Sequence, residues 1–175
     1  RLKKICRQQG YGYKMYGQSS IDNEFTHAIE SWEKLRRDTR ISVSEVKNLI
    51  RFISQKISLP TLKDYGIADL GFTTAAKQHD WMTVLREIPP EEREYLRACL
   101  RNGEKFGTDP RILVSTIHQV KGGEADNVVL VTDMGKLSWL NSTKDEEIRV
   151  WYVAITRARK NLFLIRPRTI KFFDI

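Results

Sequence analysis

The sequence predicts an α/β protein built on a parallel sheet with helices on both faces. Three apolar, β-branched runs indicate the strands: ILVSTI from Ile112, NVVLVTD from Asn127 and NLFLIRP from Asn161. A helix is expected between the last two runs, because Thr143 and Glu146 form a capping box ahead of an apolar stretch. Strands that are apolar throughout and alternate with a helix are typical of a parallel sheet that is covered on both faces.

The N-terminal part of the chain predicts a helix, a short strand and a second helix. Residues 1–9 have apolar positions on one face and are followed by Gly10, a common helix stop. The glycine-flanked segment 11–17 reads as a strand. Asp22 is the expected N-cap of a helix over 23–37, whose apolar residues are spaced for one buried face.

The middle of the chain, residues 40–108, is less regular than the parts on either side. Ser42 and Glu45 form a capping box for one more helix, after which Pro, Gly, Asp and Thr indicate short helices and turns. We therefore expect a small, mainly helical insertion over 40–108. Residues 1–39 and 109–175 would together form the α/β domain that it interrupts.

Composition describes a soluble globular protein with a basic surface. The 175 residues are 41% hydrophobic and 30% charged, and the net charge is +8. No apolar run approaches the roughly 18 residues of a transmembrane helix, so no membrane partner is expected. The positive charge favours a polyanion such as nucleic acid as a partner, although a merely basic, solvated surface would give the same count.

Cysteine and histidine usage argues against a metal centre. Cys6 and Cys99 lie far apart, and the three histidines are scattered, so no structural zinc site is expected. So few cysteines suit a reducing compartment, and we expect a cytoplasmic location. The chain lacks an initiator Met, which indicates a fragment of a longer protein.

A glycine turn with charged flanks follows the strand that begins at Ile112. Gly122 and Gly123 allow a positive φ or a close backbone approach. Lys121 offers a point charge for phosphate, Glu124 could accept hydrogen bonds from a sugar hydroxyl, and His118 could donate to a backbone phosphate. Ligands bind beyond the carboxyl ends of parallel strands, which is where this turn is expected. An ordinary Gly-Gly turn with solvated flanks is the alternative interpretation.

An arginine ends the helix that follows Thr143. This helix is apolar on nearly every side, so we expect it to be buried, and Arg157 would stand at its buried end. A buried charge without a partner is costly, so Arg157 requires an anion. A phosphate, which an arginine binds in bidentate fashion, and a structural salt bridge to Glu124 or Asp133 are equally compatible with the pattern.

The sequence has no phosphate-cradling loop of the type G-x-x-x-x-G-K-[ST]. Its one Gly-Lys pair, Gly135-Lys136, has the wrong context. Any nucleotide site formed here is therefore half of a site. An arginine that one body offers to a nucleotide held on another is the principle of the arginine finger.

Two stretches resemble motifs of a known family. TIHQVKGGEADNVVLV from Thr116 resembles motif V of the UvrD/Rep/PcrA-type superfamily 1 DNA helicases, and EEIRVWYVAITRARKNLFLI from Glu146 resembles their motif VI. Both motifs belong to the second RecA-like motor domain, in this order and at similar separation. The resemblance is strong over 111–167 and weaker over 1–37. It implies that the sheet is RecA-like.

The resemblance also implies a nucleotide site shared with another domain. Arg157 would be the finger that reaches the γ-phosphate of ATP. Glu124 would contact the nucleotide sugar, and Lys121 and Gly122 would lie at the nucleotide edge of the cleft. ATP and Mg²⁺ would be bound mainly by the N-terminal RecA-like domain of the same parent chain, which carries the phosphate loop.

The same resemblance implies contacts with single-stranded DNA. Thr116 and His118 would face the DNA and couple its binding to the state of the nucleotide. The sequence departs from the family pattern at Gly123, where a Leu is usual, and at Ala125-Asp126, where an aromatic-Pro pair is usual. These departures affect the expected geometry of the loop.

The function that follows is that of a fragment of an ATP-dependent DNA helicase or translocase. We expect it to be inactive without the phosphate-loop domain. Two alternatives from other classes are a non-enzymatic, basic nucleic-acid-binding module and a helicase-like subunit of a nuclease complex.

Overall fold

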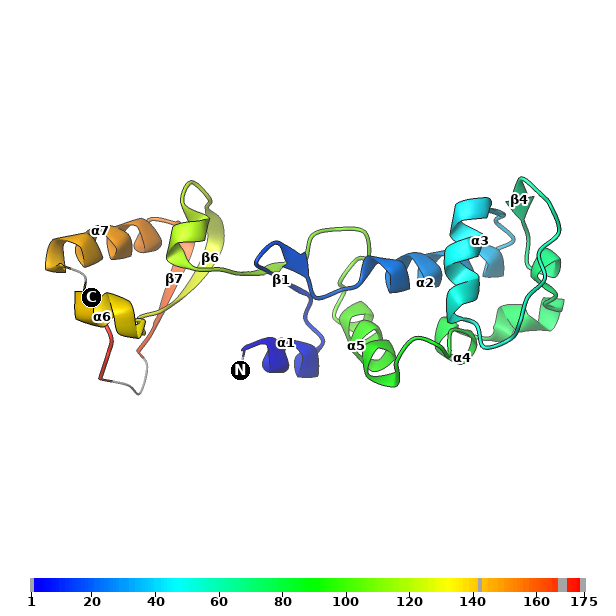
Figure 1. The fold of residues 1–175 in the computed structure, drawn as a ribbon, viewed down its shortest axis with the longest axis horizontal. Coiled ribbons are helices and arrows are strands. Elements are labelled where there is room, and N and C mark those ends of the chain that lie inside the picture. Colours follow the sequence, from blue (N-terminus) through cyan, green and yellow to red (C-terminus); the bar gives the residue numbers. More distant parts are fainter. Residues whose placement is uncertain (1, 142, 167–169, 174–175) are drawn as a thin grey trace. The chain divides into compact units, whose positions relative to one another are not determined.

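The computed structural model describes residues 2–141, 143–166 and 170–173. By its internal contacts the chain divides into two compact units, residues 1–114 and 115–175. We call them the N-terminal and C-terminal units and describe each by itself (Figure 1). The predicted division into 1–39 with 109–175 and an insertion over 40–108 stays a prediction.

The first elements of the N-terminal unit follow the sequence pattern closely. They are α1 (Leu2–Gln9), β1 (Tyr13–Met15), β2 (Gln18–Ser19) and α2 (Asn23–Arg36). Gly10 ends α1 with a φ of +69°, which an L-residue rarely adopts. Asp22 caps α2, because its carboxylate accepts a hydrogen bond of 2.7 Å from the Glu24 N–H. The predicted helix stop and the predicted helix cap are both confirmed.

The middle of the chain consists mainly of short helices. Its elements are β3 (Ile41–Ser42), α3 (Val43–Leu49), η1 (Ile50–Phe52), β4 (Asp64–Tyr65), η2 (Ala68–Leu70), η3 (Thr74–Gln78), α4 (Trp81–Val84) and α5 (Pro90–Arg101). Their apolar side chains form one core with the buried face of α2. Trp32 of α2 is fully buried in that core, beside Leu49, Leu85 and Leu96 of the middle segment. Helix α2 therefore shares its core with the segment that follows it.

A small mixed sheet completes the N-terminal unit. Strand β5 (Ile112–Val114) pairs with β1 in parallel, with Tyr13 opposite Ile112 and Met15 opposite Val114. Strand β2 pairs with the other edge of β1 in antiparallel orientation. In the order β2-β1-β5, the strand predicted from Ile112, β5, lies at the edge of this sheet.

Helix α3 begins with the predicted capping box. The Ser42 N–H donates to a Glu45 carboxylate oxygen at 2.8 Å, and the Glu45 N–H donates to the Ser42 hydroxyl at 3.4 Å. The other Glu45 oxygen accepts from Lys34 at 2.6 Å. The Lys34 ammonium and then the Ser42 N–H hold the pKa of the Glu45 carboxyl at about 2, below its ordinary 4.5. The Glu45 carboxylate of the capping box is therefore charged over most of the acid range.

We expect Glu45→Gln to lower the free energy of unfolding by about 1 kcal/mol at pH 7, the usual size of a lost cap. Because the folded pKa is depressed, this contribution is present above pH 4.5 and is lost as the pH falls towards 2. Urea unfolding of both proteins at several pH values between 7 and 2 measures the difference. Glu87→Gln, at an exposed position, is the matched control. A difference that does not change with pH would contradict the assignment.

The C-terminal unit is a strand–helix–strand arrangement. It contains η4 (Ile117–Val120), β6 (Ala125–Val131), α6 (Lys136–Asn141), α7 (Lys144–Ile155) and β7 (Ala158–Ile165). Strands β6 and β7 pair in parallel from Ala125 opposite Ala158 to Val131 opposite Ile165. Thr143 and Glu146 form the predicted capping box of α7. This unit holds motifs V and VI of the predicted helicase pattern.

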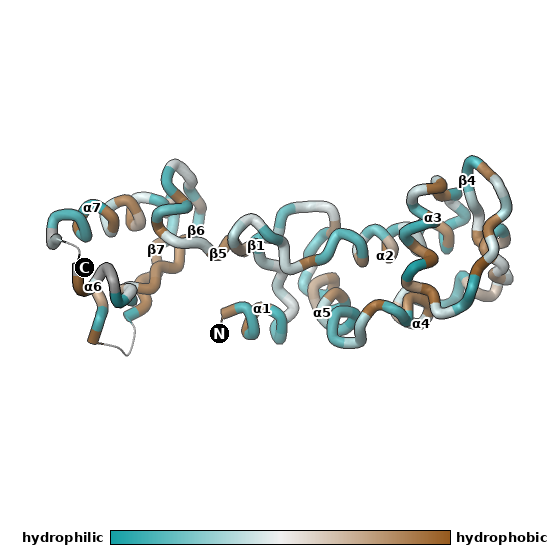
Figure 2. The backbone as a smooth tube through the Cα atoms, viewed as in Figure 1, coloured by the Kyte–Doolittle hydropathy of each residue, from teal (hydrophilic) through white to brown (hydrophobic). Residues whose placement is uncertain are grey.

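Helix α7 covers one face of the strand pair β6–β7 within the C-terminal unit. Leu130 packs with Trp151 and Ala154 of α7, whereas Val129 and Phe163 on the other face are 61% and 54% exposed. The brown β7 of Figure 2 reflects apolar residues on both faces of that strand. Coverage of both faces of the sheet stays a prediction. Side chains alternate along a strand, and α7 reaches only one set of them.

The α/β class is confirmed, but the described strands lie in small separate sheets. Within the N-terminal unit β5 pairs with β1, and within the C-terminal unit β6 pairs with β7. One RecA-like parallel sheet stays a prediction. Helix α7 also differs from the expectation of a helix buried on every side. Trp151 is buried, but Tyr152 is 68% exposed, because only one face of α7 lies against the strands.

Candidate functional site

The parallel pairing of β6 and β7 brings the glycine turn and the end of α7 together. The Ala125 N–H donates to the Arg157 carbonyl at 2.9 Å, at the point where the two strands begin. The Arg157 side chain also contacts the glycine turn, because its Nη1 donates to the Gly123 carbonyl at 3.1 Å. Two stretches about 30 residues apart in sequence thus form one local structure.

The Arg157 guanidinium is held by three neutral acceptors. Besides the Gly123 carbonyl, Nε donates to the Val153 carbonyl at 2.9 Å and Nη2 donates to the Thr156 hydroxyl at 3.1 Å. Arg157 is half-buried. Among the described residues no ion pair of Arg157 is observed, and Glu124, one of the two predicted alternatives, pairs with Arg159 instead. Its positive charge is fixed in position but not neutralised.

Three polar side-chain pairs run along the start of the two strands. They are Glu124 with Arg159 at 3.0 Å, Asp126 with Lys160 at 2.6 Å, and Asn127 with Asn161 at 2.8 Å. Both ion pairs are about half exposed, and such pairs stabilise a fold by about 1 kcal/mol or less each. As a consequence, the carboxylate of Glu124, the predicted sugar contact, already accepts a hydrogen bond from Arg159.

The glycine turn adopts the conformation that its sequence predicts. Gly122 has a φ of +85°, and the space around its Cα is open. Gly123 follows with a negative-φ backbone, and its N–H donates to the Val120 carbonyl at 2.9 Å. Lys121 ends η4 and is exposed. A side chain at 122 would be strained by the backbone angle and not by crowding.

The two predicted DNA contacts lie in and just before η4. Thr116 caps this helix: its hydroxyl accepts from the Gln119 N–H, while the Gln119 side chain accepts from the Thr116 N–H. His118 is exposed on η4. Ile117, between them, packs against the core of the C-terminal unit and fixes the helix in place. Thr116 and His118 are therefore held on the same short helix as Lys121.

The buried face of α7 anchors the helix that carries Arg157. Trp151 stacks on Phe173 with ring centroids 5.4 Å apart, and its Nε1 donates to Glu147 at 3.2 Å. Ala154, one turn before Arg157, is also buried. These contacts fix the last turn of α7, and with it the start of the Arg157 side chain.

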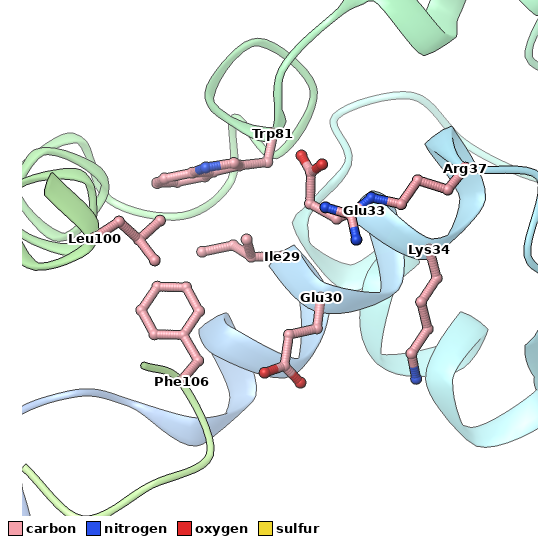
Figure 3. Close-up of a pocket in the computed structure, with 8 residues that line it drawn as sticks. All are labelled: Ile29, Glu30, Glu33, Lys34, Arg37, Trp81, Leu100 and Phe106. Carbon is pink, nitrogen blue, oxygen red and sulfur yellow. The ribbon is translucent and has the colours of Figure 1, made fainter. Parts of the chain in front are cut away.

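A cavity of the N-terminal unit lies away from the predicted site residues. It measures about 480 Å³ in the N-terminal unit, where Trp81, Leu100 and Phe106 surround Ile29 (Figure 3). Charged residues of α2 line its rim, and no predicted site residue takes part. Within the described ranges, no cluster of three or more His, Cys, Asp or Glu side chains could hold a metal ion. Nor does any described helix have the length and apolar character needed to cross a bilayer.

Comparison with known proteins identifies the class to which this arrangement belongs. The chain belongs to the UvrD-like helicase C-terminal domain family, whose model matches residues 3–169. The predicted family is thereby confirmed, and the match includes the weakly patterned middle of the chain. The F-box DNA helicase protein 1 of Schizosaccharomyces pombe (strain 972 / ATCC 24843) is 32% identical over 128 residues. That alignment covers 63% of this chain and 15% of the relative.

Proposed function

We propose that this chain is the second RecA-like motor domain of an ATP-dependent DNA helicase or translocase. The observation that carries the proposal is the state of Arg157. It stands where the two motifs meet, and its hydrogen bonds go to Val153, Gly123 and Thr156 without a carboxylate partner among the described residues. A cation held in this way suits an incoming anion, since nothing has to be displaced to free its charge.

The anion that fits is the terminal phosphate of ATP. Planar guanidinium groups match phosphate oxygens, and an arginine finger in this role contributes about 10³–10⁵ in rate by stabilising charge in the transition state. The sequence contains no phosphate loop, so ATP and Mg²⁺ would be held mainly by an N-terminal RecA-like domain. When bound, ATP would supply the phosphoryl group, and Arg157 would supply positive charge from the opposite side.

Three further residues would border the nucleotide. Lys121 is exposed and would add positive charge, and Gly122 would let the backbone approach closely. Glu124 would accept hydrogen bonds from the sugar hydroxyls. It now accepts from Arg159, so a sugar would compete with that ion pair, which is half exposed and weak.

Thr116 and His118 would contact single-stranded DNA. They share η4 with Lys121, one turn away from the glycine turn. A strand of DNA bound at η4 would therefore act on the same segment that contacts Arg157 through Gly123. The net charge of +8 supports a polyanion as partner.

We expect that the chain by itself neither binds ATP tightly nor hydrolyses it repeatedly. The test compares Mg²⁺-dependent ATP hydrolysis by purified 1–175 and by the complete protein, each with and without single-stranded DNA. Hydrolysis that DNA stimulates in the complete protein alone supports the proposal. Sustained turnover by 1–175 contradicts the half-site, and DNA binding by a complete protein without ATPase would make the chain a non-enzymatic binding module.

A further inference from the structure

We infer that Thr156 and the Gly122–Gly123 turn are positioning elements of Arg157, which set its guanidinium for the γ-phosphate. This inference rests on the proposed function. Neither element would touch the phosphate itself. They would act by fixing a long, flexible side chain in one orientation before the phosphate arrives, which lowers the cost of reaching the reactive geometry.

The three acceptors of the guanidinium come from three different places in the chain. The Val153 carbonyl belongs to the last turn of α7, the Thr156 hydroxyl belongs to the C-cap residue, and the Gly123 carbonyl belongs to the turn before β6. Together they engage Nε, Nη1 and Nη2, and therefore define the plane of the guanidinium. A single acceptor would leave that plane free to rotate.

The Thr156 hydroxyl is itself oriented by the helix. It lies 3.1 Å from the Tyr152 carbonyl and 3.0 Å from the Val153 carbonyl, to which it donates its hydrogen. Its lone pair is thereby directed to Arg157 Nη2. Serine would keep this arrangement, whereas valine, of nearly the same shape, would lose both hydrogen bonds.

The Gly123 carbonyl owes its direction to Gly122. The φ of +85° at Gly122 turns the chain so that the next peptide faces the end of α7. A Cβ at 122 would meet no atom within 4 Å, so alanine would act through backbone strain alone. The relaxation of that strain would rotate the peptide and move the carbonyl away from Nη1.

Neutral acceptors suit this task better than a carboxylate. A carboxylate would also fix the guanidinium, but it would neutralise the charge that a phosphate must meet. The nearby acids are accounted for by other partners, Glu124 by Arg159 and Asp126 by Lys160. The arrangement therefore fixes the orientation of Arg157 while its charge remains available.

The experiment measures ATP hydrolysis, stimulated by single-stranded DNA, for the complete protein and three variants at Thr156 and Arg157. We expect Thr156→Val to lower kcat about tenfold, the loss of one hydrogen bond to a charged group. The KM for ATP and the affinity for DNA should change by less than about twofold, because ground-state binding is not altered. Thr156→Ser should retain nearly all of kcat. Arg157→Ala is the reference for complete loss of the finger.

Two alanine substitutions, at Gly122 and at Gly71, test the role of the Gly122–Gly123 turn. Gly122→Ala should lower kcat several-fold, whereas Gly71→Ala should not change it. Gly71 has a φ of +76° with the same open surroundings, so both substitutions carry similar backbone strain. Gly71 lies in the N-terminal unit, whereas Gly122 lies in the C-terminal unit with Arg157. Urea unfolding of each variant checks that the strain is matched and that the proteins fold.

The outcomes separate the two proposals. A normal kcat for Thr156→Val and Gly122→Ala, beside an inactive Arg157→Ala, overturns the positioning role and leaves the finger in place. A normal kcat for Arg157→Ala overturns the proposed function itself. If Thr156→Ser is as slow as Thr156→Val, the hydroxyl is not the group that matters, and the inference is also wrong.

Discussion

Replacing Arg157 by alanine is expected to lower the DNA-stimulated kcat of the complete protein by a factor on the order of 10³, the lower end of what an arginine finger contributes. The variant loses the guanidinium that links the end of α7 to the glycine turn. Binding of single-stranded DNA should persist, because Thr116 and His118 lie on η4 and keep their own support. Steady-state ATPase assays and DNA titrations measure the two quantities.

Two variants make the Arg157 result specific. Lys160→Ala removes a nearby exposed cation that is paired with Asp126, and we expect kcat to change by less than about twofold. Arg157→Lys keeps the charge but not the planar fork, so most of the loss should remain. Equal losses for Arg157→Ala and Lys160→Ala would indicate a general effect of charge, and would argue against a finger.

Replacing Trp32 by alanine is expected to cost the N-terminal unit about 3–5 kcal/mol of stability, as for other large buried side chains. Trp32 is 0% exposed, contacts Phe72 edge to face with centroids 5.3 Å apart, and donates from Nε1 to the His79 carbonyl at 3.2 Å. The substitution leaves a cavity and an unpaired carbonyl. Urea unfolding of 1–175, followed by circular dichroism, gives the change.

Leu62→Ala is the control for the core prediction. Leu62 is exposed in the same unit, and its truncation should change stability by about 0.5 kcal/mol or less. Similar losses for the two variants would mean that α2 and the middle segment do not share the single core described above.

The local signals in the sequence were sufficient where the determining contacts are a few residues apart. Ser42 with Glu45 and Thr143 with Glu146 both form the predicted capping boxes. Such boxes depend on residues three positions apart, so they can be read directly. The pairing of strands was not predictable in the same way. The run at Ile112 looks like the run at Asn127, yet β5 pairs with β1 and β6 with β7, because partners are chosen by tertiary structure.

The same distinction applies to the site. The positive φ of Gly122 follows from residue type, and the position of Arg157 at the end of α7 follows from helical spacing. The partner of Glu124 did not follow: the sequence pattern left a salt bridge to Arg157 open, whereas Glu124 pairs with Arg159. No local signal separates the two arginines, because residues two positions apart lie on the same face of a strand. Their different partners arise because Arg157 lies between the end of α7 at Ile155 and the start of β7 at Ala158, whereas Arg159 lies within β7.

The strand pair β6–β7 also determines where the chain can change length. The connection between the strands contains α6 and α7, and residues gained or lost before α7 would leave both strand starts in place. The register shifts once between Ala125 and Asn127 and is regular from Asn127 to Val131, so a residue gained or lost in the regular part would turn the following side chains to the opposite face. We therefore expect a change in chain length to be tolerated in the connection and not within the paired segments that hold Arg157.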